Sequence, residues 1–426
     1  MIAAGTVLIG SFFLLLFLGM PIAYAMGVSS LFALWTADLN PLLIPQRLIS
    51  GTQSFSLLAV PFFVLAGELM HTGGLSRRLV NVAHQLVGFV TGGMAMVTVL
   101  ASMFFAALSG SAPATTAAIG SVMIPEMERR GYPRAFAAAL ATASGPLGQM
   151  IPPSIPMVIW GVMANVSITR LFLAGIGPGL VMGAALMAVS YVIARRRGYT
   201  GSGERPSLRQ VARAVWEAKW ALMAPLIILG GIYGGVFTPT EAAAVAVVYG
   251  LIVGAFVHRE LRLSELPRIF IRAMATTTMV VFVISTASVF GWLVAAEEVA
   301  QQVVSSVFAV TTNPVVILLL MNAVLLVLGM IMDNIAAMVI LSSVLTSVAA
   351  SIGIDPVQFG TIVVINFAIG MATPPVGYSL FVGASVSGLS IEQVAGAIWP
   401  FLLVMVAGLL VITFVPPVTL FFAGLV

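Results

Sequence analysis

The chain has 426 residues, of which 60% are hydrophobic and only 8% are charged, and its formal net charge is +4. A soluble domain cannot bury that much apolar surface, so the composition indicates a protein that crosses the lipid bilayer several times. The charged residues lie in short loops between apolar runs, where basic residues report membrane orientation, so the positive charge does not indicate a nucleic-acid partner. The absence of cysteine excludes disulfides and thiolate metal sites.

Apolar segments and short loops alternate along the first half of the chain. We expect a retained first helix over residues 5–35, kinked near Pro21, and a second helix over residues 54–70. Residues 73–89 are amphipathic and suit the membrane interface. Two interrupted apolar segments follow, and a helix over residues 171–193 closes this half.

The two interruptions carry small, polar and helix-breaking residues at mid-membrane length. The first reads SGSAPATT over residues 109–116, and the second reads SGPLGQMIPPS over residues 144–154. Inside a bilayer, backbone groups freed by such breaks are tolerated only where protein or a water-filled cavity satisfies them. Two broken helices that meet therefore predict a binding site.

The second half repeats this order of elements after a hydrophilic connector over residues 194–219. Apolar helices over residues 220–235 and 239–257 precede a charged loop, a further helix and a second interfacial stretch over residues 296–312. Two more breaks follow, GMIMDN at residues 329–334 and GMATPPVGYS at residues 370–379, and a final helix begins near Ile391.

The matched order predicts the fold class. We expect an all-α polytopic membrane protein built from two inverted repeats, residues 1–200 and 201–426. Each repeat would contribute scaffold helices, one re-entrant helical hairpin and one helix broken at a Pro-Pro pair.

The basic residues orient this topology. If residues 73–89 lie on the cytoplasmic side, 16 of the 18 Lys and Arg residues fall inside and only Arg47 and Arg170 fall outside. The positive-inside rule favours this arrangement. The first hairpin would then open to the cytoplasm and the second to the periplasm.

The breaks have the chemistry of a cation site. Unwound carbonyls and Ser or Thr hydroxyls supply oxygen ligands, glycine allows close approach, and proline leaves upstream carbonyls without an N–H partner. A Na⁺ ion needs no acidic ligand beyond such oxygens. The alternative is that the breaks are simple kinks, but their recurrence in matched positions favours a carrier site.

Few acidic residues lie within the apolar segments. Asp333 lies deepest, where it would either bind a cation or cap a helix that begins at Asn334. We expect Thr240 to be the N-cap of the helix over residues 239–257, with Glu241 in its first turn, which is a structural role. Glu68 and His71 have the spacing of half a di-iron motif, but the motif occurs once, which disfavours a metal site.

Motifs for catalysis or nucleotide hydrolysis are missing from the sequence. It contains no HExxH, no Walker A sequence and no GxSxG. We therefore predict that the chain is not an enzyme, and that an ion gradient or a partner supplies any energy for transport.

Five segments together carry a family resemblance. They read LLAVPFFVLAGELM, SGSAPATTAAIGSVMIPEM, IPPSIPMVIWG, GGIYGGVFTPTEAAAVA and GMATPPVGYSLFV. Through nearly its whole length the chain resembles the large membrane subunit of tripartite ATP-independent periplasmic (TRAP) transporters, in the ion-transporter superfamily. The resemblance implies a multi-pass protein of the bacterial cytoplasmic membrane that imports an organic acid with Na⁺ by an elevator mechanism, in which a transport domain moves against a scaffold.

The resemblance also implies partners and site residues. A periplasmic binding protein would deliver the acid, and a separate small four-helix membrane subunit would join this chain. At least two Na⁺ ions would bind, with supporting or substrate contacts from Ser111, Asp333 and Asn334. The implied ligands are Ser109, Gly148, Ile151 and Pro153 at one ion site, mostly through main-chain oxygens, and Gly329, Gly370, Thr373 and Val376 at the other. Ala106 departs from the family pattern, where a hydroxyl residue can stand.

Three other functions compete with this interpretation. A stand-alone Na⁺/dicarboxylate symporter of the same architecture would not depend on a binding protein. A non-transporting membrane scaffold would tolerate substitution at the Pro-Pro breaks and at Asp333. An intramembrane hydrolase is disfavoured because no nucleophile has a base beside it in a recognisable motif.

Overall fold

The computed structural model describes residues 4–201, 203 and 205–425, so the outer ends of the two predicted repeats, residues 1–3 and 426, lie outside the described residues. Within this part of the chain every regular element is a helix. The helices are α1 (Ala4–Phe17), α2 (Ile22–Thr36), α3 (Leu43–Ser50), η1 (Phe55–Leu58), α4 (Ala59–Thr72), α5 (Leu75–Val87), α6 (Gly93–Ser109), α7 (Ala112–Arg129), α8 (Arg134–Ser144), α9 (Leu147–Met150), α10 (Ile155–Met163), α11 (Ile168–Arg197), α12 (Leu208–Glu217), α13 (Lys219–Tyr233), α14 (Pro239–Ile252), η2 (Val253–Val257), η3 (Leu263–Glu265), α15 (Leu266–Ala296), α16 (Val299–Val310), α17 (Pro314–Ile331), α18 (Asn334–Ile352), α19 (Pro356–Gly370), α20 (Tyr378–Ser387), α21 (Ile391–Phe414) and α22 (Pro417–Ala423).

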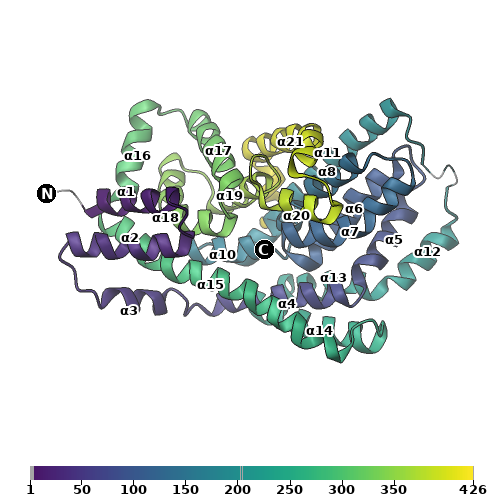
Figure 1. Ribbon diagram of the computed structural model, residues 1–426, viewed down its shortest axis with the longest axis horizontal. Coiled ribbons are helices and arrows are strands. Elements are labelled where there is room, and N and C mark those ends of the chain that lie inside the picture. The colour runs from purple at the N-terminus through teal and green to yellow at the C-terminus, as the bar shows by residue number, and fades with distance from the viewer. Residues whose placement is uncertain (1–3, 202, 204, 426) are drawn as a thin grey trace.

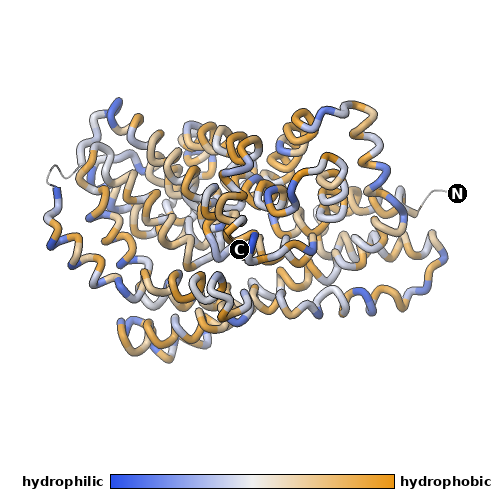
Figure 2. Tube along the Cα trace, turned by 180° about the vertical axis from the view of Figure 1, so that it is seen from behind, coloured by the Kyte–Doolittle hydropathy of each residue, from blue (hydrophilic) through white to orange (hydrophobic). Residues whose placement is uncertain are grey.

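The helices have the length and composition of membrane spans. Among the described residues, seven are long and apolar enough to cross a bilayer, and eight if the bent pair α12 and α13 counts as one span. Figure 2 shows mostly hydrophobic helices between two ends where hydrophilic segments are more frequent. The chain is a multi-pass, all-α membrane protein.

The first predicted helix is wrong in one respect, because residues 5–35 form two helices and not one kinked helix. α1 ends at Phe17, and α2 starts after Pro21 and packs beside α1. Gly19 takes φ +83°, which reverses the chain direction, and Pro21 has no N–H to continue the α1 ladder. Glycine and proline close together indicate a turn. The apolar residues on both sides of Gly19 and Pro21 made a kink within one helix an equally good interpretation.

The helices pack in two groups. α1, α2, α3 and α4 contact α15, and α14 packs on α4 with α13 beside it. Figure 1 shows α3, α4, α13, α14 and α15 along one edge of the molecule. In the other group, α6, α7, α8 and α9 pack with α19, α20, α21 and α11. α10 and α18 belong to this second group and also contact α4 and α15, respectively, of the first.

The two predicted interfacial stretches are helical and lie at opposite ends of the molecule. α5 lies beside α6 and α12, while α16 lies beside α18 and α15. Figure 1 shows α5 and α12 at one end and α16 at the other. α12 occupies part of the predicted connector because Ser207 and Gln210 form a capping box that starts a helix there.

The start of α14 corrects a predicted cap. Its N-cap is Thr238 and not Thr240, because the Thr238 hydroxyl accepts a hydrogen bond from the N–H of Glu241 while the Glu241 carboxylate accepts one from the N–H of Thr238. Pro239 follows the cap and has a φ preorganised for the first helical position. Glu241 is in the first turn, as predicted, and its role is structural.

The charge distribution predicts which side of the membrane each end faces. A reporter fused near Gly203 should be cytoplasmic because the basic loops favour the inside. One near Ser351 should be periplasmic by counting spans, since no Lys or Arg follows Arg272. Paired fusions of an enzyme active only in the periplasm and a fluorophore active only in the cytoplasm measure this directly. A third fusion after Arg130 serves as a control and should match Gly203. If Gly203 and Ser351 report the same side, the predicted topology fails.

Candidate binding site between the broken helices

The first predicted break is a tight turn between α6 and α7 that is lined by hydroxyl groups. α6 ends at Ser109, and Gly110 takes φ +61°, a conformation that glycine adopts without strain. Ser111 is the N-cap of α7, since its Oγ accepts from the N–H of Ala114 at 3.5 Å. The hydroxyl oxygens of Ser109 and Thr115 lie 2.8 Å apart. The turn therefore concentrates oxygen atoms at the N-terminus of α7.

The second predicted break packs against this turn. A Cβ atom on Gly148 of α9 would lie 2.5 Å from the carbonyl oxygen of Ser111, closer than real Cβ atoms approach, so the contact requires glycine. A Cβ atom on Gly110 would lie 2.9 Å from the carbonyl oxygen of Pro153. The N–H of Ile155 donates to the carbonyl of Gly110 at 3.2 Å. The predicted residues of the first ion site thus gather around one turn.

Ile151 lies between Gly148 and Pro153 in the second break. It follows α9 in an extended conformation, φ −83° and ψ 126°, where the helix gives way to residues 151–154. Its side chain packs against Gly179 of α11, because a Cβ atom there would collide with the Ile151 side chain. The peptide bond between Pro152 and Pro153 is cis.

The third and fourth breaks meet in the same way. Gly329 of α17 and Gly370 of α19 touch, since a Cβ atom on Gly370 would lie 2.7 Å from the Gly329 Cα. The N–H of Gly377 donates to the carbonyl of Met330 at 3.0 Å. A Cβ atom on Gly377 would lie 2.7 Å from the carbonyl oxygen of Thr373, and Gly377 itself takes φ +44°. These contacts hold the unwound segment after α19 against the end of α17.

Thr373 and Val376 occupy different environments within this segment. Thr373 is buried, and its hydroxyl donates to the carbonyl of Ile369 at 2.8 Å, which leaves the Oγ1 lone pairs free to bind a ligand. Val376 is 41% exposed, so its apolar side chain makes no polar contribution and only its backbone can serve an ion site. The peptide bond between Pro374 and Pro375 is cis.

Asp333 and Asn334 stand at the start of α18. The Asp333 side chain is exposed, and its Oδ1 accepts from the N–H groups of Ile335 and Ala336 at 3.0 and 3.2 Å, so it caps the helix, the second of its two predicted roles. Asn334 is buried. Its Nδ2 donates to Oε1 of Gln149 at 2.9 Å.

Gln149 joins the two clusters. It is buried in α9 beside Gly148, and besides the bond from Asn334 its Nε2 lies 3.5 Å from the sulfur of Met371, in the unwound segment of the other cluster. A thioether is a weak acceptor, so one strong donor of Gln149 is poorly used. Gln149 is not among the predicted site residues. The sequence signal that could have identified Gln149 is a long polar side chain among small and apolar residues in a membrane segment, where burying such a side chain is costly.

Two buried hydroxyl groups near the clusters lack a partner. Within the described part of the chain, nothing hydrogen-bonds Thr116 Oγ1 or Ser379 Oγ. Thr116 is the fifth residue of α7 and lies against Gly145, and Ser379 is in the first turn of α20. Buried polar groups in membranes are normally satisfied, so each cluster has an oxygen atom available to a ligand. Among the described residues no group of three or more His, Cys, Asp or Glu side chains could hold a metal ion, so the clusters offer mainly carbonyl and hydroxyl oxygens.

The spans and the two interior clusters define a polytopic membrane protein with a candidate binding site where broken helices meet. Residues 9–418 match the model of the tripartite ATP-independent periplasmic transporter, DctM component. The chain belongs to this family. The prediction of a TRAP large membrane subunit is therefore confirmed.

Several named relatives agree with this assignment. The chain is 47% identical to the isethionate TRAP transporter permease protein DctMQ of Oleidesulfovibrio alaskensis over 98% of its own length, but it spans only 66% of that longer protein. It is 43% identical to the C4-dicarboxylate TRAP transporter large permease protein DctM of Pseudomonas aeruginosa, covering 88% of this chain and 87% of the relative. These proteins are transporter permeases, which confirms the prediction of a transporter component and not an enzyme.

The architecture also resembles solved transporters of low sequence identity. The Alcanivorax borkumensis YdaH transporter superposes with a TM-score of 0.62 at 15% identity, covering 87% of this chain and 86% of that one. The Neisseria gonorrhoeae MtrF structure gives the same TM-score at 14% identity, over 90% of this chain and 86% of that one. Similarity at this level of identity establishes a shared fold only.

The bond between Gln149 and Asn334 predicts energetic coupling of the two clusters. Gln149→Ala and Asn334→Ala should each destabilise the protein, and the double variant should be less destabilised than their sum by about 1 kcal/mol, a typical value for hydrogen bonds between membrane helices. Unfolding titrations in mixed detergent micelles measure the three free energies.

A remote pair provides the control for this cycle. The Thr36 hydroxyl bonds its own helix at Ala33, far from the clusters in the fold. Asn334→Ala combined with Thr36→Ala should be additive within about 0.5 kcal/mol. Additivity in the Gln149 cycle as well would show that the amide pair carries no coupling.

Proposed function

We propose that this chain is the large membrane subunit of a secondary-active transporter that imports a small organic acid with Na⁺ across the bacterial inner membrane. The observation that carries the proposal is the meeting of two broken-helix clusters, joined by Gln149 and Asn334. Broken helices that meet at membrane depth are where transporters of this kind bind ions and substrate. A direct bond between the clusters provides a physical route for coupling them.

At least two Na⁺ ions would bind, one at each cluster. At the first cluster, Ser109 and the backbone around Gly148, Ile151 and Pro153 would supply oxygen ligands. The hydroxyl oxygens of Thr115 and Thr116 would be additional ligands. At the second, the ligands would be the backbone around Gly329, Gly370 and Val376 together with Thr373, with Ser379 as an additional hydroxyl.

The organic acid would bind between the two ions. α7 and α18 have 18 and 19 residues and begin at the clusters, so the positive ends of their dipoles favour an anion there. Ser111, Asn334 and the underused amide of Gln149 are the nearest polar groups for its carboxylate. Related proteins are named as permeases for isethionate, C4-dicarboxylates and sialic acid, and an acidic group is what those substrates share.

Transport would follow an elevator mechanism built on inverted repeats, residues 1–200 and 201–426. The order of α5, α6 with α7, α8 to α10 and α11 is matched by α16, α17 with α18, α19 with α20 and α21, which supports the repeat. The two packing groups of helices support a mobile domain that carries both clusters and a scaffold of α1 to α4 with α13 to α15. In the first repeat the hairpin would open to the cytoplasm, and in the second to the periplasm.

The proposed system has two protein partners, a periplasmic substrate-binding protein and a separate small four-helix membrane subunit. The alternative is a stand-alone Na⁺/dicarboxylate symporter. The fold does not distinguish between the two functions, because the solved transporters that share it have little sequence identity with this chain. Family membership favours the tripartite system.

The test of the proposed function is uptake into proteoliposomes that contain this chain and its small subunit. Labelled organic acids are supplied with and without an inward Na⁺ gradient and the cognate binding protein. The proposal requires both for uptake. Uptake that needs Na⁺ but ignores the binding protein would favour the stand-alone symporter, and uptake that ignores Na⁺ would refute ion coupling.

Removing single hydroxyls tests the two ion sites. Ser109→Ala and Thr373→Ala each delete one oxygen ligand at a cost of about 1 kcal/mol, so the Na⁺ concentration for half-maximal uptake should rise about fivefold. The matched control is Ser121→Ala, whose exposed hydroxyl bonds only the carbonyl of Ala118 in its own helix. An unchanged Na⁺ requirement in both site variants would remove the proposed ligands.

A further inference from the structure

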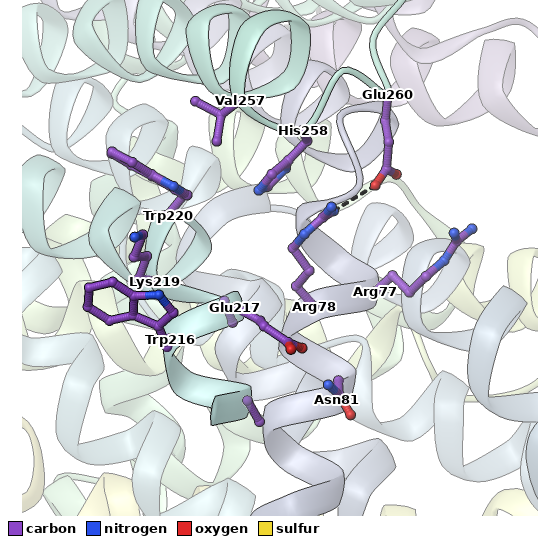
Figure 3. A pocket seen from close by; sticks show the side chains of 12 residues that line it. Arg77, Arg78, Asn81, Trp216, Glu217, Lys219, Trp220, Val257, His258 and Glu260 are labelled. Atoms are coloured by element: carbon purple, nitrogen blue, oxygen red, sulfur yellow. Dashed lines mark ion pairs between the residues drawn. The ribbon is translucent and has the colours of Figure 1, made fainter. Parts of the chain in front are cut away.

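A pocket lies away from the broken helices, at the end of the molecule where α5 and α12 stand. Its volume is about 720 Å³, and three elements line it. These are the start of α5, the junction of α12 with α13, and the segment after η2. Figure 3 shows Lys219 near Trp216 and Trp220 on one side of the pocket, His258 and Arg78 on the other, and Arg77 further out at the rim.

The surroundings of this pocket are those of a membrane interface. α12 and α13 are bent by 63°, so the chain changes direction where α12 ends and the apolar α13 begins. α12 exposes Leu208 at 89% and Trp216 at 69%, and Trp220 at the start of α13 is 38% exposed. Exposed tryptophans and an amphipathic helix beside basic residues are typical of the boundary between lipid headgroups and acyl chains.

The charges of the pocket leave two cations without a carboxylate. Glu260 accepts from Arg78 at 2.8 Å, and Glu217 accepts from Arg213 at 3.0 Å. Within the described residues, neither Arg77 nor Lys219 has a carboxylate within 4.0 Å. The Lys219 ammonium instead lies 3.7 Å from the centre of the Trp216 ring, a cation–π contact.

His258 adds no charge to this balance near neutral pH. Its Nδ1 lies 2.9 Å from the carbonyl oxygen of Gly73, which fixes the ring beside the start of α5. Burial lowers the pKa of His258 below its ordinary value, and a lowered histidine pKa means a neutral ring at pH 7. The uncompensated charge of the pocket therefore comes from Arg77 and Lys219.

We propose that this pocket binds the headgroup of an anionic phospholipid, of the phosphatidylglycerol class, from the membrane leaflet that faces the basic end of the protein. The phosphodiester would lie between Lys219 and the arginines of α5, and the acyl chains would leave past Trp216 and Trp220. Basic pockets between transmembrane helices on the cytoplasmic side suit such headgroups. The open side of the pocket carries exposed tryptophans and Val257, which is 41% exposed. These apolar side chains can contact the acyl chains of a lipid but not free phosphate, so they favour a lipid.

Native mass spectrometry of the full chain in detergent, titrated with phosphatidylglycerol, tests this site. Arg77→Gln with Lys219→Gln should weaken binding of the first lipid about fivefold for each cation removed. The control, Arg209→Gln with Arg268→Gln, removes the same charge from exposed positions on α12 and α15 that do not line the pocket. Binding by the control should match that of the unsubstituted chain. Size-exclusion profiles and lipid-free unfolding midpoints of all three proteins verify that each is folded.

Three outcomes would overturn the proposal. Equal weakening in both double variants would assign the effect to general surface charge. Equally tight, equally variant-sensitive binding of phosphatidylcholine would refute selection for an anionic headgroup. Displacement of the lipid by inorganic phosphate at equal concentration would assign the pocket to the free anion. Should one double variant fail to fold, Trp216→Ala, which removes the cation–π contact and the apolar exit, must still lower lipid binding relative to Leu208→Ala.

Discussion

The structure depends on satisfying the backbone groups that four helix breaks release inside an apolar environment. Each break packs on another break: Gly148 and Pro153 pack on the turn at Gly110, and Gly370 packs on Gly329. Lipid offers no hydrogen bonds, so these pairs must stay together for either to exist. The rest of the fold supplies helices that hold the two pairs in register. This explains why glycine occurs at the contacts, since any side chain there would separate the partners.

The two pairs are themselves joined where Gln149 meets Asn334 and Met371. Asn334 begins the same helix that Asp333 caps, so its bond to Gln149 connects the second cluster with α9 of the first. In the proposed transporter, ions at both clusters and an acid between them would therefore bind to one connected unit. The basic pocket at α5, α12 and α13 shares no residues with the clusters.

Sequence patterns predicted the breaks and most helices because proline, glycine and clustered hydroxyl residues interrupt apolar runs in a way that composition makes visible. The split between α1 and α2 was not predicted, since Gly19 and Pro21 are equally compatible with a kink, and only packing of α2 on α1 decides between them. Thr238 and Thr240 both precede Glu241, and the spacing of the capping box, not residue type, selects Thr238. Gln149 could not be assigned from its own segment, because its partner lies 185 positions away.

Binding of Na⁺ to the purified chain tests the central claim most directly, that the paired breaks form cation sites. The unfolding midpoint in detergent is followed as Na⁺ replaces choline at constant ionic strength, with K⁺ as a second comparison. A ligand that binds only the folded state stabilises it in proportion to the logarithm of its concentration above the dissociation constant. We predict that the unfolding midpoint rises with Na⁺ but not with K⁺, and that this rise is smaller in the combined Ser109→Ala and Thr373→Ala variant. An equal rise with K⁺, or none with Na⁺, would contradict it.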